Sequence, residues 1–151
     1  MYLDSTAILP LLLDQAEAPS LANRIEQAEA PLITSPISVL ETAAGLSDAT
    51  GAAIVEAHEL VREFMTLGKI QLIPIHPEIS RRAIQAYAEH GTTTSASGKL
   101  VIVETMIFAC AKFYSAPLLY TGDRFSRAGL DEATRLSPLG RAIAASNTAG
   151  S

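Results

Sequence analysis

The feature of this sequence that most constrains its fold is an alternation of short apolar runs with longer segments of helical periodicity. Strand-sized apolar runs occupy 1–4, 31–34, 70–75 and 117–120. Between them lie stretches in which apolar residues recur every three or four positions. Parallel strands need long crossovers, which are usually helices. This order therefore predicts an α/β fold with a parallel sheet that is covered by helices on both faces.

The longer segments carry signals for where helices begin and end. Ser35 is a candidate N-cap, with Pro36 at the first helical position. The almost uniformly apolar segment 100–111 predicts a helix that is buried on most sides. Another apolar stripe stops at Gly68, a residue type that commonly ends helices; its members are Ala57, Leu60, Val61, Phe64 and Leu67. Further helices are expected over 7–13, 21–28 and 79–90.

The composition indicates one apolar domain. A length of 151 residues suits a single globular domain, which we expect over 1–143, followed by a small, polar tail over 144–151. Hydrophobic residues make up 48% of the chain and charged residues 18%. Because that balance is apolar for a monomeric soluble protein, a partner is expected to cover part of the surface, in a homodimer or another complex.

The cysteine count and the apolar runs bear on the cellular compartment. Cys110 is the single cysteine, so no internal disulfide can form and a reducing compartment fits. No apolar run reaches the roughly 18 residues needed to span a bilayer, and the N-terminus lacks the basic start of a signal peptide. We therefore expect a cytoplasmic protein that does not associate with membranes.

The net charge of −5 argues against a broadly basic surface for binding nucleic acid. It does not exclude contact with phosphate through a metal ion. Acids that surround a cation contribute to the formal charge but change the field that a substrate meets.

Two glutamates lie in helical segments that offer them no local counter-charge. Glu104 interrupts the apolar run LVIVETMIFACA, and its neighbours three and four residues away are all apolar. Burying an unpaired carboxylate costs several kcal/mol, so its compensating partner must come from elsewhere in the fold. Glu41 likewise has no cation at the spacings that form ion pairs within a helix.

Two aspartates follow strand-sized runs. Asp4 ends the first run and Asp123 follows the fourth. The carboxyl ends of parallel strands share one edge, where such folds bind ligands, so we expect both aspartates to meet there with the two glutamates. Clustered carboxylates raise one another's pKa unless a cation neutralises them, and an all-oxygen set suits Mg²⁺ or Mn²⁺ better than zinc. The histidines show no metal-ligand spacing; they are His58, His76 and His90.

Each acid also has an ordinary structural explanation. Asp4 can cap the following helix, and Asp123 can be a turn residue. Glu41 can face the solvent, and Glu104 can pair with a distant arginine or lysine. Only the four acids taken together favour a shared site.

Three sequence motifs in this order resemble PIN domains of the VapC toxin type. They are DSTAIL at 4–9, SPISVLE at 35–41 and APLLYTGDRF at 116–125. The resemblance extends from residue 2 to about residue 131, and it implies a three-layer α/β/α sandwich around a mostly parallel sheet of four to five strands. It also implies an endoribonuclease that depends on Mg²⁺ or Mn²⁺, cuts RNA and is inhibited by a cognate antitoxin.

The resemblance also assigns roles to residues of this chain. Its catalytic acids fall on Asp4, Glu41, Glu104 and Asp123. Of these, Asp4, Glu104 and Asp123 are the expected metal ligands, whereas Glu41 either binds metal or orients the attacking water. Thr6 or Ser5 is expected to hydrogen-bond a ligand water or a substrate phosphate. Lys99, Arg124 and Arg127 are candidate contacts to RNA phosphates.

Two departures from the family pattern keep alternatives open. The late-helix acid is usually aspartate but is Glu104 here, and a second acid often stands near Asp123, where this chain has Arg124. One alternative is therefore a PIN-like module that binds RNA or an antitoxin without cutting. A phosphatase-like hydrolase with Asp4 as nucleophile is less favoured, because that chemistry commonly wants a second acid where this chain has Thr6.

Overall fold

The centre of the molecule is a parallel sheet of four very short strands. The computed structural model describes residues 1–92 and 99–127, and these contain β1 (Tyr2–Leu3), β2 (Ile33–Thr34), β3 (Gln71–Leu72) and β4 (Leu118–Leu119). The strand order is β3-β2-β1-β4, and all three pairings are parallel. Tyr2 on the central β1 lies opposite Ile33 on one side and Leu118 on the other. The predicted α/β class with a parallel sheet is confirmed.

The strand order reverses its direction beside β1. From β1 the chain moves outward through β2 to β3, and it then returns to β4 on the opposite side of β1. Open parallel sheets bind their ligands at the carboxyl ends of the strands next to such a reversal. The Asp4 N–H donates to the Leu119 carbonyl (3.0 Å), so the chain leaving β1 stays beside β4 at this edge.

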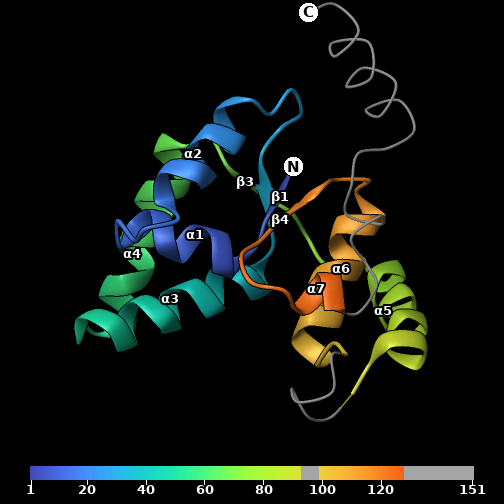
Figure 1. Ribbon diagram of the computed structural model, residues 1–151. Helices are drawn as coiled ribbons and strands as arrows, with labels where there is room; N and C mark the ends of the chain where they lie inside the picture. The colour runs from blue at the N-terminus through green and yellow to red at the C-terminus, as the bar shows by residue number, and fades with distance from the viewer. Residues whose placement is uncertain (93–98, 128–151) are drawn as a thin grey trace, which may run out of the picture.

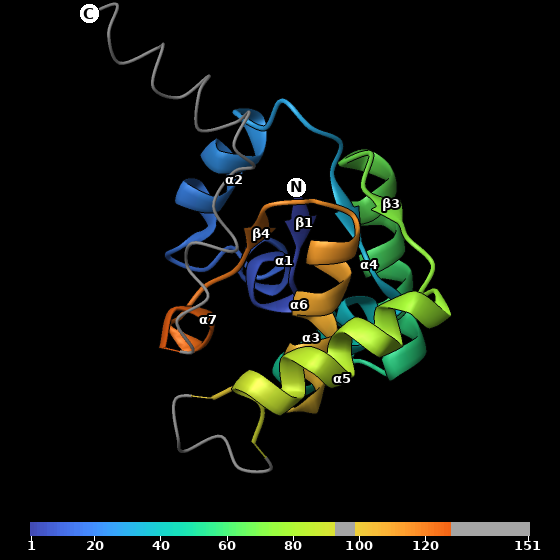
Figure 2. The ribbon, with the colours of Figure 1, turned by 90° about the vertical axis from the view of Figure 1, so that its right-hand side faces the viewer.

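Two layers of helices cover the two faces of the sheet (Figure 1). Successive strand residues point to opposite faces. Leu3 and Leu119 pack in one core with α1 (Ser5–Leu12), α2 (Ala18–Glu26), α3 (Pro36–Thr50) and α4 (Ile54–Leu67). Tyr2 and Leu118 pack in the other core with α5 (Pro77–His90), α6 (Ile102–Phe113) and α7 (Arg124–Arg127). The expected three-layer arrangement is therefore present, and Figure 2 shows α5 and α6 from their own side.

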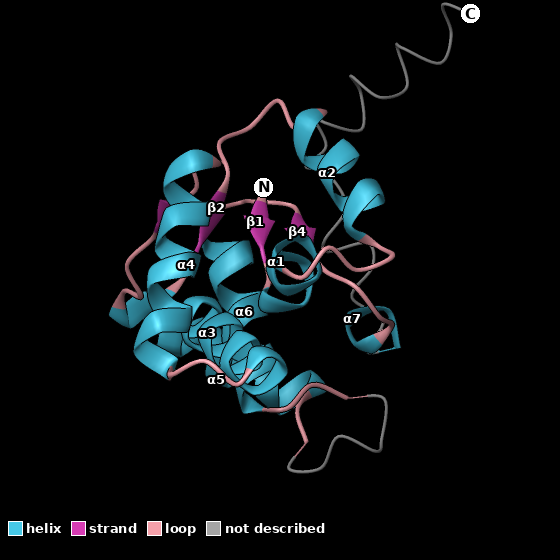
Figure 3. Ribbon diagram, turned by 90° about the vertical axis from the view of Figure 1, so that its left-hand side faces the viewer, coloured by secondary structure: helices cyan, strands magenta, loops and turns pink. Residues whose placement is uncertain are grey.

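Local chemistry sets the helix boundaries nearest the reversal. The Asp4 side chain caps α1, and Pro36 begins α3 immediately after β2. Gly51 ends α3 with a φ of 75°, a left-handed conformation that glycine adopts without a Cβ clash. Figure 3 shows that β2, β1 and β4 lie side by side, with α1 and α3 starting below them.

Two expectations about helix residues are correct only in part. Ser35 is the N-cap residue of α3 and Pro36 is its first residue, as expected, but the Ser35 side chain makes no capping bond. Its hydroxyl instead lies 2.6 Å from the Tyr2 hydroxyl, in a buried pair. Leu60 and Leu67 are 49% and 77% exposed although they belong to the predicted apolar stripe. Burial in α4 follows a narrower row, Ala57, Val61 and Met65, which faces the core.

The apolar segment 100–111 is also less regular than expected. The helix α6 begins only at Ile102, because Leu100 pairs with Gly91 in an isolated β-bridge. Ile102 is 68% exposed, so the first turn of α6 is not buried on most sides. The later turns are buried, as predicted, and they contain Cys110, whose pKa is raised by burial to about 11.

The remaining expectations concern the end of the chain and the membrane. The domain boundary at 143 and the tail at 144–151 lie outside the described residues. Among the described helices, none has the length and apolar character that crossing a membrane requires.

Candidate active site

Asp4 lies at the carboxyl end of β1, where its side chain caps the first turn of α1. Its Oδ2 atom accepts hydrogen bonds from the Thr6 hydroxyl (2.6 Å) and the Thr6 backbone N–H (3.3 Å). Burial raises the pKa of the Asp4 carboxyl, the bonds from Thr6 oppose that shift, and the negative charge of Glu104 adds to it. The helix-cap explanation for Asp4 is therefore correct, but it accounts for only one of the two carboxylate oxygens.

The second oxygen, Asp4 Oδ1, has no hydrogen-bond partner. Among the buried side-chain nitrogen and oxygen atoms of residues 1–92 and 99–127, it alone is unsatisfied. Asp4 is only 3% exposed, so bulk water does not solvate this atom freely. A buried polar atom without a partner is costly in free energy, and it points to a missing ligand such as a water molecule or an ion.

Thr6 connects Asp4 to the loop that follows β4. Its hydroxyl donates to Asp4 Oδ2 and accepts from the Thr121 N–H (3.1 Å). The Thr121 hydroxyl in turn donates to the Thr6 carbonyl (2.9 Å). The single hydroxyl proton of Thr6 is therefore already used by Asp4. Thr6 fixes the orientation of Asp4 in this structure, whereas its predicted contact with substrate stays a prediction.

Glu41 lies in the second turn of α3, half-buried on the same side as Asp4. Its Oε2 atom accepts a hydrogen bond from the Ser5 hydroxyl (3.1 Å). Burial raises the pKa of Glu41, and the negative charges of Asp4 and Glu104 raise it further. The Ser5 hydrogen bond and the positive charge of Arg124 lower it. Glu41 is therefore coupled to the other acids and does not simply face the solvent.

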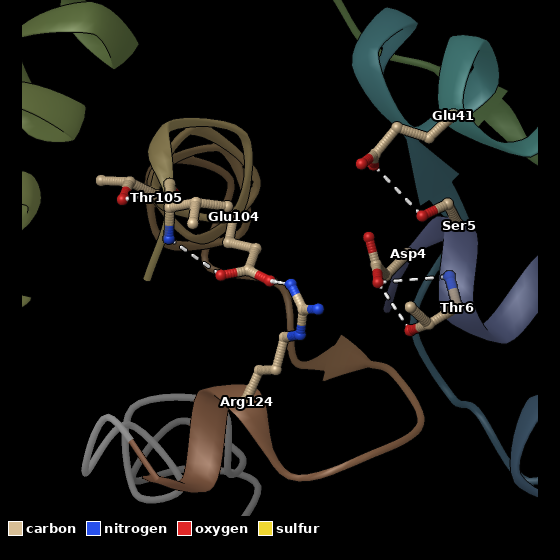
Figure 4. A network of polar contacts seen from close by, with 8 residues as sticks. Asp4, Ser5, Thr6, Glu41, Glu104, Thr105 and Arg124 are labelled. Carbon is tan, nitrogen blue, oxygen red and sulfur yellow. Dashed lines mark hydrogen bonds and ion pairs between the residues drawn. The ribbon is translucent and has the colours of Figure 1, made fainter. Parts of the chain in front are cut away.

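Glu104 lies in the first turn of α6 with both carboxylate oxygens engaged (Figure 4). Oε2 accepts a hydrogen bond from the Val101 N–H (2.9 Å), which is a free donor at the start of the helix. Oε1 accepts from the Arg124 guanidinium, which forms an ion pair with it. The prediction that the partner of Glu104 comes from outside its helix is confirmed, and the partner is a distant arginine.

Arg124 begins α7 and reaches back across the edge of the sheet to Glu104. Its side chain is 60% exposed, whereas that of Glu104 is 12% exposed. The hydrogen bond that Arg124 donates to Glu104, and the negative charge of Glu104, raise the pKa of Arg124, and the charges of Glu41 and Asp123 add to this effect. The positive charge of Arg124 therefore interacts with the negative charges of several acids of the predicted site.

The other predicted residues lie around this centre or beyond the described side chains. Asp123 is exposed, immediately before α7, and it interacts electrostatically with Arg124. Lys99 is exposed, two residues before the N-cap of α6. Arg127 is the last residue of α7, and its side chain lies outside the described part of the structure.

The acids fit a divalent cation in part. Asp4 offers a buried oxygen that lacks a partner, and Asp4, Glu41 and Glu104 influence one another electrostatically. All of these donors are oxygens, which is the ligand type that Mg²⁺ and Mn²⁺ prefer. In the part of the chain that the structure describes, however, no three His, Cys, Asp or Glu side chains are close enough to hold one ion. Both oxygens of Glu104 already accept hydrogen bonds, so neither is free to bind a metal ion in this structure. The predicted ligand set of Asp4, Glu104 and Asp123 stays a prediction.

Comparison with known proteins agrees with this geometry. The family model of the PIN domain matches residues 1–130. The chain belongs to the PIN-domain family. A curated relative, a VapC ribonuclease of Rhizobium meliloti (strain 1021), is 27% identical over 139 residues, which cover 85% of this chain and 98% of that protein.

A solved structure shares the PIN fold of this chain. The crystal structure of VapC20 from Mycobacterium tuberculosis, described as a toxin that cleaves the sarcin-ricin loop, matches with a TM-score of 0.63. The match covers 85% of this chain and 94% of VapC20, at 17% sequence identity. At that identity the likeness shows the fold alone. The family match and the curated relative together relate this PIN domain to VapC ribonucleases.

Two hydrogen-bond partners around the acids of this PIN domain had no clear signal in the sequence, and a third had one. Ser5 was expected to contact water or phosphate, but its hydroxyl binds Glu41. Thr121 binds Thr6 from a distance of 115 residues along the chain, which no local pattern reveals. The bond between the Val101 N–H and Glu104 did have a signal, because a glutamate three residues after an N-cap commonly accepts from the N-cap backbone.

Proposed function

We propose that this PIN domain is a divalent-metal-dependent endoribonuclease that hydrolyses phosphodiester bonds of RNA. The observation that carries the proposal is the unpartnered, buried Oδ1 of Asp4, which lies at the sheet edge beside the strand reversal. Two further acids, Glu41 and Glu104, act electrostatically at the same place. The relationship to a VapC ribonuclease supports RNA as the substrate class.

The described residues can divide the work of hydrolysis between them. Asp4 Oδ1 is the best-placed ligand for Mg²⁺ or Mn²⁺, with Glu104 and Asp123 as the further ligands that we propose, directly or through water. When bound, such an ion lowers the pKa of a coordinated water and neutralises charge on the leaving oxygen. Glu41, held by Ser5 and with its pKa raised by burial, is suited to accept a proton from the attacking water.

Contact with the RNA backbone requires cations, because the chain as a whole is acidic. We propose that Arg124, Arg127 and Lys99 bind phosphates close to the scissile bond. Arg124 begins α7 at the edge where the acids meet, and more than half of its side chain is exposed. A phosphate can therefore approach it without displacing the core.

The proposal is tested by incubating a pool of structured RNAs with the purified protein, with Mn²⁺, with Mg²⁺ or with a chelator. We expect cleavage only with metal. Asp4→Asn should lower the rate by roughly a hundredfold or more, because a metal ligand contributes several kcal/mol to transition-state stabilisation. Asp14→Asn is the matched control, since Asp14 is exposed and has a positive φ that asparagine also tolerates. Equal rates for wild type and Asp4→Asn would refute the proposal.

A second function is favoured by the ion pair between Glu104 and Arg124. A PIN domain whose late-helix acid is neutralised by its own arginine can bind RNA without cutting it. The same experiment separates the two functions when it is combined with a filter-binding measurement on the same RNA pool. Binding without cleavage, in both Mn²⁺ and Mg²⁺, would establish the module that binds only.

We further propose that a cognate antitoxin and a second copy of this chain cover part of its surface. The relatives are VapC proteins, and several large apolar side chains are exposed; on α4 they are Ile54, Val55, Leu60 and Leu67. Exposed apolar patches commonly mark sites of protein association. Light scattering of the purified chain tests the homodimer, and we propose the cytoplasm as its compartment.

A further inference from the structure

Arg124 lies among the acids of the site. Its guanidinium forms an ion pair with Glu104 and also interacts electrostatically with Glu41 and Asp123. Three of the four acids assigned to the site therefore act on one positive charge. In Figure 4 the guanidinium of Arg124 lies on the side of Glu104 that faces Asp4.

The charges at this edge do not balance. Asp4, Glu41 and Glu104 influence one another as acids, and Arg124 opposes them with a single positive charge. Arg124 binds Glu104 Oε1 while Asp4 Oδ1 stays without a partner. A divalent cation carries twice the charge of a guanidinium and is therefore attracted more strongly to the same carboxylates.

The two partners of the ion pair are not equally fixed. Glu104 is buried, and its other oxygen is held by the Val101 N–H at the start of α6. Arg124 is 60% exposed and belongs to a helix of only four residues. Because more than half of the Arg124 side chain is exposed, water can replace its contact with the carboxylate, so the guanidinium can leave at small cost in free energy. The movable member of the pair is therefore the arginine.

We propose that Arg124 is an internal counter-cation of the site, bound to Glu104 in the metal-free protein and displaced from Glu104 when a divalent cation binds. This inference rests on the proposed function, because it assumes that the acids bind a metal ion. It makes Arg124 a competitor of the metal, so that metal binding and release of the guanidinium are one coupled event.

The opposite role would make Arg124 a residue that positions Glu104 as a metal ligand. The two roles predict opposite signs for one measurement. Removing a competitor strengthens metal binding, whereas removing a positioning residue weakens it. Metal affinity, measured without RNA, therefore decides between the roles and does not depend on catalytic activity.

The experiment is an equilibrium titration with Mn²⁺, in which electron paramagnetic resonance counts the free ion. We expect Arg124→Gln to bind Mn²⁺ about two- to fivefold more tightly than wild type, the factor that corresponds to an ion pair screened by solvent on its arginine side. Arg124→Lys should lie between them, because lysine keeps the charge but loses the forked geometry. Arg81→Gln is the control for net charge, since it removes the same charge from an arginine that forms an exposed ion pair with Glu78 on α5.

A second measurement follows the guanidinium itself. The NMR signal of the Arg124 Nε–H is assigned by its loss in Arg124→Gln. In the diamagnetic Mg²⁺ complex, this signal should shift to a position typical of an exposed arginine. In the metal-free protein it should report the ion pair with Glu104. Circular dichroism checks that each variant is folded. If Arg124→Gln does not fold, the titration is made with Arg124→Lys.

The possible outcomes separate this inference from the proposed function. Unchanged or weaker Mn²⁺ binding by the Arg124 variants, with normal binding by wild type, overturns the counter-cation alone. Equal tightening in Arg81→Gln also overturns it, because the effect would then be one of net charge. No binding in wild type, in Arg124→Gln or in Asp4→Asn overturns the metal site and the counter-cation together. Binding by Arg124→Gln that is lost on adding Asp4→Asn supports both.

Discussion

Asp4 and Glu104 approach the same edge of the sheet from opposite sides, and their carboxylates are stabilised by different kinds of partner (Figure 4). Asp4 is held by the hydroxyl and backbone of Thr6, which are neutral donors, and keeps one oxygen without a partner. Glu104 is held by a backbone N–H and by the guanidinium of Arg124. Only one of the two acids is balanced in charge.

This difference shows two ways in which a fold can hold carboxylates close together without a bound metal ion. Neutral donors orient a carboxylate but leave most of its charge uncompensated, so its affinity for a cation is preserved. A guanidinium removes that affinity, at least until a stronger cation arrives. Asp4 therefore keeps an oxygen that can bind a cation, whereas the carboxylate of Glu104 is already paired with Arg124.

The largest expected effect concerns the orientation of Asp4. Thr6→Val removes the hydroxyl that binds Asp4 Oδ2 and Thr121, and we expect RNA cleavage to fall by about 10- to 100-fold, as is typical when a partner of a metal ligand is lost. Thr6→Ser keeps the hydroxyl and should retain most activity. Steady-state cleavage rates at saturating Mn²⁺ check this. If Thr6→Val matches Thr6→Ser, the neutral donors do not orient Asp4.

A smaller effect is expected on stability, and it should differ between the two acids. Glu104→Gln loses the ion pair with Arg124, and we expect a loss of about 1 kcal/mol, since the arginine is largely exposed and solvent screens the pair. Asp4→Asn replaces a buried, uncompensated charge by a neutral amide and should not destabilise the metal-free protein at neutral pH.

Urea denaturation with a chelator present measures both variants. If Asp4→Asn destabilised the protein and Glu104→Gln did not, Asp4 would be the compensated acid and Glu104 the uncompensated one. An equal loss in both would show that the two carboxylates are compensated to the same degree.

The pH dependence of stability gives a third test of the uncompensated side. The pKa of Asp4 is raised on folding, mainly by burial, so the folded state binds more protons than the unfolded state between the ordinary and the raised pKa. Metal-free stability should therefore rise as the pH falls through the raised pKa, and the gain should be complete below the ordinary value of 3.8. Glu41 contributes with the same sign.

The measurement is a series of urea melts between neutral and acidic pH, for wild type and Asp4→Asn. The variant should show a smaller rise in stability than wild type because it lacks one of the two shifted groups. Identical pH profiles would mean that Asp4 is compensated in solution.

The smallest expected effect comes from Ser5, whose hydroxyl donates to Glu41 (3.1 Å). Ser5→Ala should cost about 0.5–1 kcal/mol, because the carboxylate is only half-buried and water can replace the donor. Thermal melts check this against Ser20→Ala, at an exposed serine of α2 that should be nearly silent. A loss well above 1 kcal/mol would show that Glu41 depends on Ser5 as strongly as Asp4 depends on Thr6.

Much of the fold could be predicted because its signals are local. The strand-sized runs, Pro36 after β2 and Gly68 after α4 each act within a few residues. The exposure of Leu60 and Leu67 could not be predicted in this way. Periodicity shows that a helix has an apolar stripe, but how much of that stripe is covered depends on the width of the layer packed against it.

The position of Asp4 at the carboxyl end of β1 could be predicted, but the contacts of the acids could not. The sheet edge follows from strands that end in Asp4 and precede Asp123, so the sequence was informative there. The ion pair between Glu104 and Arg124 joins residues 20 positions apart through a β-strand and two loops. Its only trace in the sequence was an arginine where relatives often have a second acid, and a charge reversal alone does not say which carboxylate it meets.

The pairing of β1 with β4 has a consequence for how the protein is made. A ribosome delivers Asp4 and Thr6 first, but their partners Leu119 and Thr121 emerge more than a hundred residues later. Until then the first strand lacks its neighbour on one side, and α7, which carries Arg124, does not yet exist. Asp4 and Thr6 therefore reach this arrangement only after the segment with Leu119 and Thr121 has been synthesised, so an unfinished chain that stops before β4 has no complete site.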